Sequence, residues 1–214
     1  MTFPFLHFRM RNIVIALMKT INFFTTNREK ILEMQRIATS ISQTINIKPT
    51  HFTGKEPEEN GNTFSENSEI KFLFYENHLN SAELLIAEDS GFEITELENF
   101  PSIHSARFLK QFSTKQEAFQ ELGNMLFSKN GKKTSHARFV CDICTRINGE
   151  IKHFYATTEG ELSFQNHNNE GFGYDPIFIP TNSTKTFSEM SGTEKDNFSH
   201  RAKAFKQLLQ FISC

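Results

Sequence analysis

The chain has 214 residues, and its 23 Lys and Arg against 25 Asp and Glu give a formal net charge of −2. This near-neutral balance excludes a general nucleic-acid binder, which carries a basic stripe and a high pI. A hydrophobic content of 37% excludes a polytopic membrane protein and a wholly disordered chain. A domain of this length can bury about 70% of its surface, so we expect a core that needs no disulfides.

The three cysteines, Cys141, Cys144 and Cys214, cannot form a disulfide framework, and their odd number suits a reducing compartment. Cys141 and Cys144 form a CxxC motif, but this motif lies within the strand-like run 139–147. Residues three apart on a strand point to opposite faces, so we expect neither a zinc site nor a redox pair.

The first residues superficially resemble a secretory signal, because Arg9 and Arg11 precede a short apolar run at 13–17. That run is too short to span a bilayer, and no small-residue cleavage site follows it. We therefore interpret residues 1–17 as an extension or a misassigned start, with translation beginning at Met10 or Met18. On this interpretation we expect a cytoplasmic protein.

The chain then opens with a strand, a loop and a helix. Residues 21–24 form a short apolar run typical of a strand, and Asn27 is placed to cap the helix that follows. The apolar stripe of that helix consists of Ile31, Met34, Ala38 and Ile41. A polar acidic loop over 54–62 comes next.

A second helix is predicted over 64–77, followed by a buried strand over 83–87 that ends in the polar turn 88–91. Thr114 and Glu117 then form a capping box. The helix that starts there has apolar residues at helical spacing, namely Ala118, Leu122, Met125 and Leu126.

Strands predicted over 138–147 and 150–157 flank Asn148-Gly149, the strongest short signal for a hairpin. A glycine-rich loop over 170–176 follows, and Ser199 caps the last helix. The apolar positions of that helix are Phe205, Leu208, Leu209 and Ile212. The combination of strand–helix units and a hairpin predicts an α/β fold with a mixed sheet.

The loop 25–30 is a candidate anion site. A polar loop at a helix N-terminus offers backbone N–H groups and the positive end of the helix dipole, and Lys30 adds a point charge one turn into the helix. The loop is not a Walker A motif, which needs GxxxxGK[ST]. The alternative is an ordinary capped helix with a surface lysine.

Two groups of acids are candidates for metal binding or for activating water. Adjacent acids alternate in direction, so one of Glu88 and Asp89 can face a cleft while the other packs inside or meets solvent. The loop 56–59 supplies a second carboxylate for one Mg²⁺, which also takes oxygens from substrate phosphates. The alternatives are a solvated turn and a solvated acidic loop.

Two later segments carry groups suited to a nucleotide base. Phe172, Tyr174 and Asp175 stand in the glycine-rich loop, where aromatic rings can stack on bases and the acid can accept from a base N–H. Lys195 and the run 199–201 bring three potential donors to a helix start. The alternatives are a turn with core aromatics and a capped helix with a solvated basic turn.

Taken in order, these motifs resemble those of the inosine triphosphate pyrophosphatase family, which acts on non-standard purine nucleoside triphosphates. The family pattern runs T-x-N-x-x-K, an acidic loop before a helix, [DE]-D-S-G, P-G-x-Y-S-A-R, F-G-[YW]-D-P-x-F and S-H-R. The corresponding segments here are 25–30, 56–59, 88–91, 101–107, 172–178 and 199–201. Order and spacing match from about Ile21 to the C-terminus.

The resemblance implies an α/β fold with two lobes around a long twisted mixed sheet and a substrate cleft between the lobes. It implies one such domain over residues 18–214, usually as a homodimer, and Mg²⁺-dependent hydrolysis of ITP, dITP and XTP to the monophosphate and pyrophosphate. By motif match, Asp89 is the implied general base or metal-linked acid. Glu59 is the implied second Mg²⁺ ligand, although Glu58 is close enough to dispute it.

The same match implies which residues bind the purine nucleoside triphosphate. The loop 25–30 is expected to hold the triphosphate, Lys71 and Ser90 to touch the nucleotide or its phosphates, and two aromatic rings to pack on the purine. The implied binding residues are Thr25, Thr26, Asn27, Arg28, Glu29, Lys30, Lys71, Ser90, Phe172, Gly173, Tyr174, Asp175, Lys195, His200 and Arg201.

Base specificity is expected to come from Lys195 and Arg201, which can only donate hydrogen bonds and therefore suit the O6 acceptor of inosine or xanthine. The 6-amino group of adenine would set donor against donor and leave a buried polar group unpaired. Guanine also has O6, so exclusion of GTP needs a feature at C2 that the sequence does not identify.

The chain departs from the family pattern at Ser102, at His104 and at Arg28-Glu29, which puts the loop before Arg107 and the fit of the phosphate loop in doubt. None of these changes removes a proposed catalytic group. Two alternatives stay open: a pyrophosphatase for other modified nucleotides, and a nucleotide-binding protein without catalysis.

Overall fold

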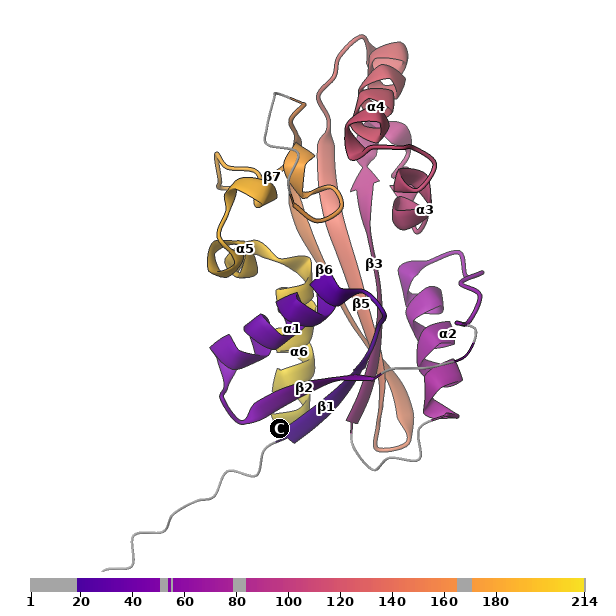
Figure 1. Cartoon of the computed structure of the whole chain (residues 1–214), viewed down its shortest axis with the longest axis vertical. Coiled ribbons are helices and arrows are strands. Elements are labelled where there is room, and N and C mark those ends of the chain that lie inside the picture. Colours follow the sequence, from indigo (N-terminus) through magenta and orange to yellow (C-terminus); the bar gives the residue numbers. More distant parts are fainter. Residues whose placement is uncertain (1–18, 51–53, 55, 79–83, 165–170, 214) are drawn as a thin grey trace, which may run out of the picture.

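In the computed structural model the chain forms a twisted sheet with helices packed against both of its faces (Figure 1). The structure describes residues 19–50, 54, 56–78, 84–164 and 171–213, so the expected extension over 1–17 lies outside the described residues. The elements are β1 Lys19–Phe24, α1 Arg28–Ile41, β2 Ile45–Thr50, α2 Phe64–Glu76, β3 Leu84–Ile94, β4 Pro101–Ser102, α3 Ser105–Leu109, α4 Lys115–Asn130, β5 His136–Ile147, β6 Glu150–Leu162, β7 Phe178–Pro180, α5 Gly192–Phe198 and α6 His200–Ser213. Short 3₁₀ turns lie at Thr95–Leu97, Asp175–Ile177 and Phe187–Glu189.

Within the described residues the strands follow the order β2-β1-β3-β5-β6-β7, and β4 pairs with β3. β1 runs parallel to β2 and β3, whereas the other pairs are antiparallel. The predicted α/β fold with a mixed sheet is therefore confirmed. The sequence pattern does not predict β2. It is an edge strand, where Pro49, which has no N–H to donate, is tolerated.

The predicted hairpin is confirmed and is longer than its sequence signal. β5 and β6 pair from Ile147 and Glu150 at the turn to His136 and Glu161 at the far end. Asn148 and Gly149 both have positive φ, 52° and 84°, which the tight turn between twisted strands requires. These long strands carry buried side chains on both faces of the sheet, such as Cys141 and Cys144 of β5.

The predicted end of the strand at residue 87 is wrong, because β3 continues to Ile94. Residues 86–94 pair one by one with β5, so backbone hydrogen bonding holds the segment 88–91 in the sheet instead of releasing it as a turn. Strand alternation then puts Glu88 and Asp89 on opposite faces of the sheet. Their contacts, described below, follow from this alternation.

The helix caps predicted from sequence are present. The Oγ of Ser199 accepts from the N–H of Ala202 at the start of α6, and Thr114 accepts from the N–H of Glu117 at the start of α4. The capping box at Thr114 is incomplete, because the Glu117 carboxylate accepts from the N–H of Ser113 instead. On α1, Met34 and Ala38 are buried as predicted, whereas the last position of the stripe, Ile41, is exposed.

Over the described part of the chain, the core divides into three groups of buried side chains around the shared sheet. One lies beneath α1 and α6 and contains Cys141. Another lies beneath α2 on the opposite face and contains Phe72 and Cys144, so the CxxC cysteines point to opposite faces as predicted. The third, beneath α3 and α4 at the far end of β3 and β5, is rich in Phe and contains Phe92.

Candidate active site

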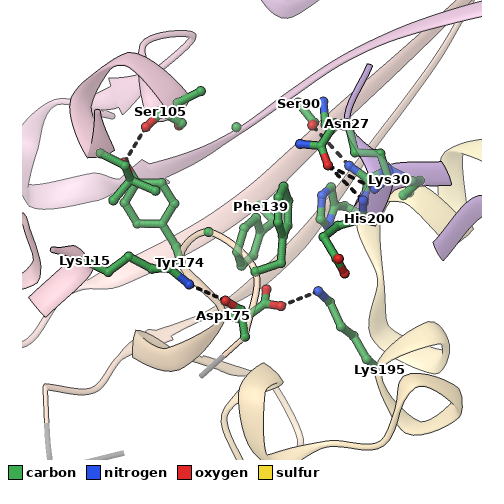
Figure 2. A pocket seen from close by; sticks show the side chains of 18 of the residues that line it. Asn27, Lys30, Ser90, Ser105, Lys115, Phe139, Tyr174, Asp175, Lys195 and His200 are labelled. Atoms are coloured by element: carbon green, nitrogen blue, oxygen red, sulfur yellow. Dashed lines mark hydrogen bonds and ion pairs between the residues drawn. The ribbon is translucent and has the colours of Figure 1, made fainter. Parts of the chain in front are cut away.

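A cavity of about 720 Å³ opens between the start of α1, the middle of β3, α3 and the segment 171–175 (Figure 2). A smaller cavity of about 460 Å³ adjoins it, and both are lined by Lys30, Ser90, Ala106 and Lys110. The predicted residues that line the larger cavity are Asn27, Glu29, Lys30, Ser90, Phe172, Gly173, Tyr174, Asp175, Lys195, His200 and Arg201. Those that line the smaller cavity include Glu59, Lys71 and Asp89.

The loop 25–30 is tied to the start of α1 by its own side chains. The Oδ1 of Asn27 accepts from the N–H groups of Glu29 and Lys30, 3.0 and 3.3 Å away, and the Oγ1 of Thr25 accepts from the N–H of Asn27. They hold the backbone of Lys30, a residue that lines both cavities. Thr25, Thr26 and Arg28 belong to the same loop but are not among the residues that line either cavity.

On one face of β3, Glu88 lies at the centre of a buried ionic network. The guanidinium of Arg201 contacts its carboxylate at 2.7 and 3.1 Å, and Lys30 Nζ lies 2.8 Å from it. Arg201 also contacts Glu33 of α1, and it donates to the Oγ of Ser90 at 3.2 Å. Most of the hydrogen-bonding capacity of Arg201 is therefore used within the protein.

The charges in this network stabilise one another. Burial is the largest single influence on both carboxyl groups and alone would raise their pKa values, but Arg201 and the neighbouring cations together outweigh burial. Arg201 and Lys195 lower the pKa of Glu33 to about 2, and Arg201 and Lys30 hold that of Glu88 well below its usual range. Both acids are thus ionised at neutral pH, and they balance the positive charges of Arg201 and Lys30.

On the opposite face of β3, Asp89 faces α2. The Nζ of Lys71 lies 2.9 Å from Asp89 Oδ1 and 3.3 Å from Glu59 Oε1. Burial raises the pKa of the Asp89 carboxyl although Lys71 acts against the shift. Glu59 is held in place by Arg107, whose Nη2 donates to the Glu59 backbone carbonyl at 2.9 Å.

Asp89 and Glu59 form a pair that fits a hard divalent cation. The Oδ2 of Asp89 is buried and has no hydrogen-bond partner, so it is available as a ligand. Among the described residues no group of three or more His, Cys, Asp or Glu side chains comes together as a metal site. A carboxylate pair beside a phosphate site is the arrangement that Mg²⁺ uses when substrate oxygens complete its shell.

Aromatic rings line the larger cavity. Tyr174 stacks on Phe92 with ring centroids 4.8 Å apart, and its hydroxyl donates to the carbonyl of Ser105 at 2.9 Å. The His200 ring stacks on Phe139 at 4.9 Å. Burial, followed by the nearby charge of Arg201, lowers the pKa of His200 well below 6.5, so the ring is neutral. Its Nδ1 is buried without a hydrogen-bond partner.

Lys195 is one of the cations that line the larger cavity. Its Nζ lies 2.6 Å from Asp175 Oδ2 and 5.2 Å from the ring centroid of Phe187 (Figure 2). Asp175 is buried, and burial raises its pKa although Lys195 opposes the shift. The pair therefore presents a positioned donor next to a carboxylate at the cavity wall.

The sequence analysis missed several residues of the site. Glu33 lies one turn after Lys30 and one turn before the buried Ile37, and this helical spacing was the available signal. Arg107 stands within the motif 101–107 but was given no role. Lys110 and Lys115 line the larger cavity, and Lys115 donates to the Gly171 carbonyl. No local pattern marks these two lysines.

The fold and the site together define an open-sheet α/β protein whose cleft joins an aromatic cavity to a carboxylate–lysine cavity. The chain belongs to the Ham1 family, whose model matches residues 21–211, and this confirms the resemblance inferred from the motifs.

Curated relatives and solved structures agree with this assignment. A protein of Malacoplasma penetrans named dITP/XTP pyrophosphatase is 38% identical over 197 residues, which cover 88% of this chain and 95% of that protein. A protein of the same name from Borreliella burgdorferi is 36% identical over 203 residues, covering 91% and 96% of the two chains. The solved structure of a HAM1 protein from Coxiella burnetii has a TM-score of 0.75 and 30% identity, covering 92% of this chain and 99% of that one.

Proposed function

We propose that this chain hydrolyses the non-standard purine nucleoside triphosphates ITP, dITP and XTP to the monophosphate and pyrophosphate, and so removes them from the nucleotide pool. The observation that carries the proposal is the pair of adjoining cavities. One is lined by aromatic rings and the Lys195–Asp175 pair, the other by Asp89, Glu59 and Lys71, and Lys30 lies at their junction.

In this proposal the purine occupies the larger cavity and the triphosphate extends past Lys30 into the smaller one. The carboxylate of Asp89 orients a water molecule and accepts its proton as the water oxygen attacks the α-phosphorus. The bond from the α-phosphorus to the bridging oxygen breaks, and pyrophosphate leaves with that oxygen. A raised pKa suits a buried carboxyl group to this role as a proton acceptor.

The negative charge of the phosphates would be offset by positive groups of the protein and by the metal. Lys30 and the N-terminal end of α1 lie where negative charge develops, and positioned donors of this kind stabilise a transition state without reorganising. Glu59 and Asp89 would hold Mg²⁺, which when bound offsets the negative charge of the triphosphate. We propose Glu59 over Glu58 because the Glu59 carboxylate reaches Lys71, the partner of Asp89.

The base is read by Lys195, which can only donate and therefore favours a 6-oxo purine over adenine. The sequence analysis expected Arg201 to donate to O6 of the base as well. Its contacts to Glu88, Glu33 and Ser90 use most of its donors, so we assign it a different role. We propose that Arg201 holds together the buried side chains beneath the site. We also propose that neutral His200, with its unpartnered Nδ1, lies beside the base.

The remaining expectations belong to the same proposal: a Mg²⁺ cofactor, a homodimer, a cytoplasmic location, and neither nucleic acid nor a membrane as partner. No helix in the described part of the chain is both long and apolar enough to cross a membrane.

The proposal is tested by measuring pyrophosphate release with Mg²⁺ from ITP, XTP, dITP, GTP and ATP. We expect release from the first three and little from the last two. Equal release from all five would contradict the 6-oxo selection and keep the phosphate site. No release, with ITP still raising the melting temperature, would instead support a nucleotide-binding protein without catalysis.

A further inference from the structure

Lys71 occupies the space between the two carboxylates that would hold a divalent cation. Its ammonium lies 2.9 Å from Asp89 Oδ1 and 3.3 Å from Glu59 Oε1, and both its own side chain and that of Asp89 are largely buried, 13% and 8% exposed. The two acids come from different elements, β3 and the loop before α2. The ammonium is therefore the counter-ion that brings them together when no metal is bound.

An ammonium and a divalent cation cannot both contact the same two carboxylates without strong repulsion, since like charges a few ångströms apart in a partly buried site are poorly screened. The surrounding charges increase this conflict. The smaller cavity is lined by the cations Lys30, Lys71, Arg107 and Lys110, and by the acids Glu58, Glu59 and Asp89. Because Lys30 is paired with Glu88, the other three cations already match the three acids, and a bare divalent cation would enter a cavity whose acids are balanced.

A triphosphate changes this charge balance, because its anionic oxygens can replace the two carboxylates as partners of the Lys71 ammonium. Lysine is a compact charge on a flexible four-carbon stem, so Nζ can move several ångströms while the backbone of α2 stays in place. Lys71 can then leave the carboxylates and contact phosphate oxygens at the edge of the same cavity. The carboxylates are released for the metal only when this second partner is present.

We propose that Lys71 is a built-in cation that occupies the metal position between Asp89 and Glu59 until a nucleoside triphosphate draws it away. The protein then binds Mg²⁺ weakly on its own and more tightly with nucleotide. A metal ion does not settle in the site before the substrate arrives. This inference rests on the proposed function, because it takes Asp89 and Glu59 as the metal ligands.

The test is the affinity of the nucleotide-free protein for Mn²⁺, a paramagnetic substitute for Mg²⁺, measured by electron paramagnetic resonance. We expect Lys71→Met to bind Mn²⁺ about tenfold or more tightly than the unmodified chain. The matched control is Lys110→Met, which removes the same charge from the same cavity. Lys110 is exposed and is not paired with either acid. The affinity of the Lys110→Met variant for Mn²⁺ should therefore stay within about twofold of that of the unmodified chain.

A second measurement needs no substitution and guards against a misfolded variant. The affinity of the unmodified chain for Mn²⁺ should rise about tenfold or more when a non-hydrolysable ITP analogue is present. The inference is overturned if Lys71→Met binds Mn²⁺ no more tightly, if Lys110→Met tightens binding equally, or if the analogue has no effect. Pyrophosphate release by the unmodified chain under those outcomes would leave the proposed function standing, so the two failures are distinguishable.

Discussion

The guanidinium of Arg201 contacts the Glu88 carboxylate at two points, with Nε 2.7 Å from Oε2 and Nη2 3.1 Å from Oε1. Both side chains are almost completely buried, 2% and 1% exposed. The next residue along β3, Asp89, points to the other face and pairs with Lys71. One strand thus places the Glu88–Arg201 pair on one face of the sheet and the Asp89–Lys71 pair on the other.

Replacing Glu88 by Gln should destabilise the protein by about 3–5 kcal/mol, because it leaves the buried charge of Arg201 with only Glu33 to balance it. The matched control is Glu76→Gln. Glu76 also contacts an arginine, Arg146, at two points, but both side chains are about one third exposed, so its loss should have a much smaller effect. Urea unfolding of both variants measures this difference. Equal losses of unfolding free energy in the two variants would contradict the larger contribution expected of the buried Glu88–Arg201 pair.

The pH dependence of stability should show two windows. The pKa of His200 is lowered from 6.5, so the unfolded chain takes up a proton that the folded one does not, and stability falls as pH drops below about 6.5. The pKa values of Glu33 and Glu88 are also lowered, so their stabilising effect is present above about 4.5 and is lost as pH falls toward 2.

Substitution separates the two windows. His200→Phe keeps a ring to stack on Phe139 and should remove the loss of stability between about pH 6.5 and 5. Asp89 and Asp175 have raised pKa values, so they stabilise the folded chain as pH falls. The measured loss of stability at low pH should therefore be smaller than the shifts of His200, Glu33 and Glu88 alone imply. The free energy of unfolding across this pH range is the measurement. An unchanged upper window in His200→Phe would contradict the assignment.

Asp89→Asn should lower pyrophosphate release by about 10²–10⁴-fold, since the amide cannot accept the proton of the attacking water. The fold should survive, because Asn has nearly the same shape and burial already disfavours the charged form of Asp89. Release is measured together with the shift in melting temperature caused by ITP, which should persist. Near-normal turnover would remove Asp89 from the mechanism.

Lys195→Met should reduce the preference for ITP over ATP by about 100-fold or more, because the site loses the donor that pairs with O6. The control is Lys185→Met, which removes a lysine from the exposed Lys185–Glu194 pair outside the larger cavity. The ratio of kcat/KM for the two substrates is the readout. If the ratio falls equally in both variants, the preference for ITP depends on the total positive charge of the protein and not on recognition of the base by Lys195.

Much of the fold was predictable because its signals are local. The hairpin turn depends on two adjacent residues that tolerate positive φ, and the caps at Asn27 and Ser199 depend on side chains within one helical turn. The end of β3 was mispredicted for the opposite reason. The run 88–91 looks polar enough for a turn, and only pairing with β5, about fifty residues later, keeps it in the sheet.

The sequence by itself determined the order of the elements and the set of groups available for chemistry, because short-range patterns and the motif series contain that information. The tertiary structure alone decided how those groups are paired. Arg201 reaches Glu88 across 113 residues of sequence, and it lies inside a core where its charge must be balanced. Lys71 reaches Asp89 only because β3 continues as a strand and turns that side chain toward α2, since alternation along a strand follows from pairing and not from composition.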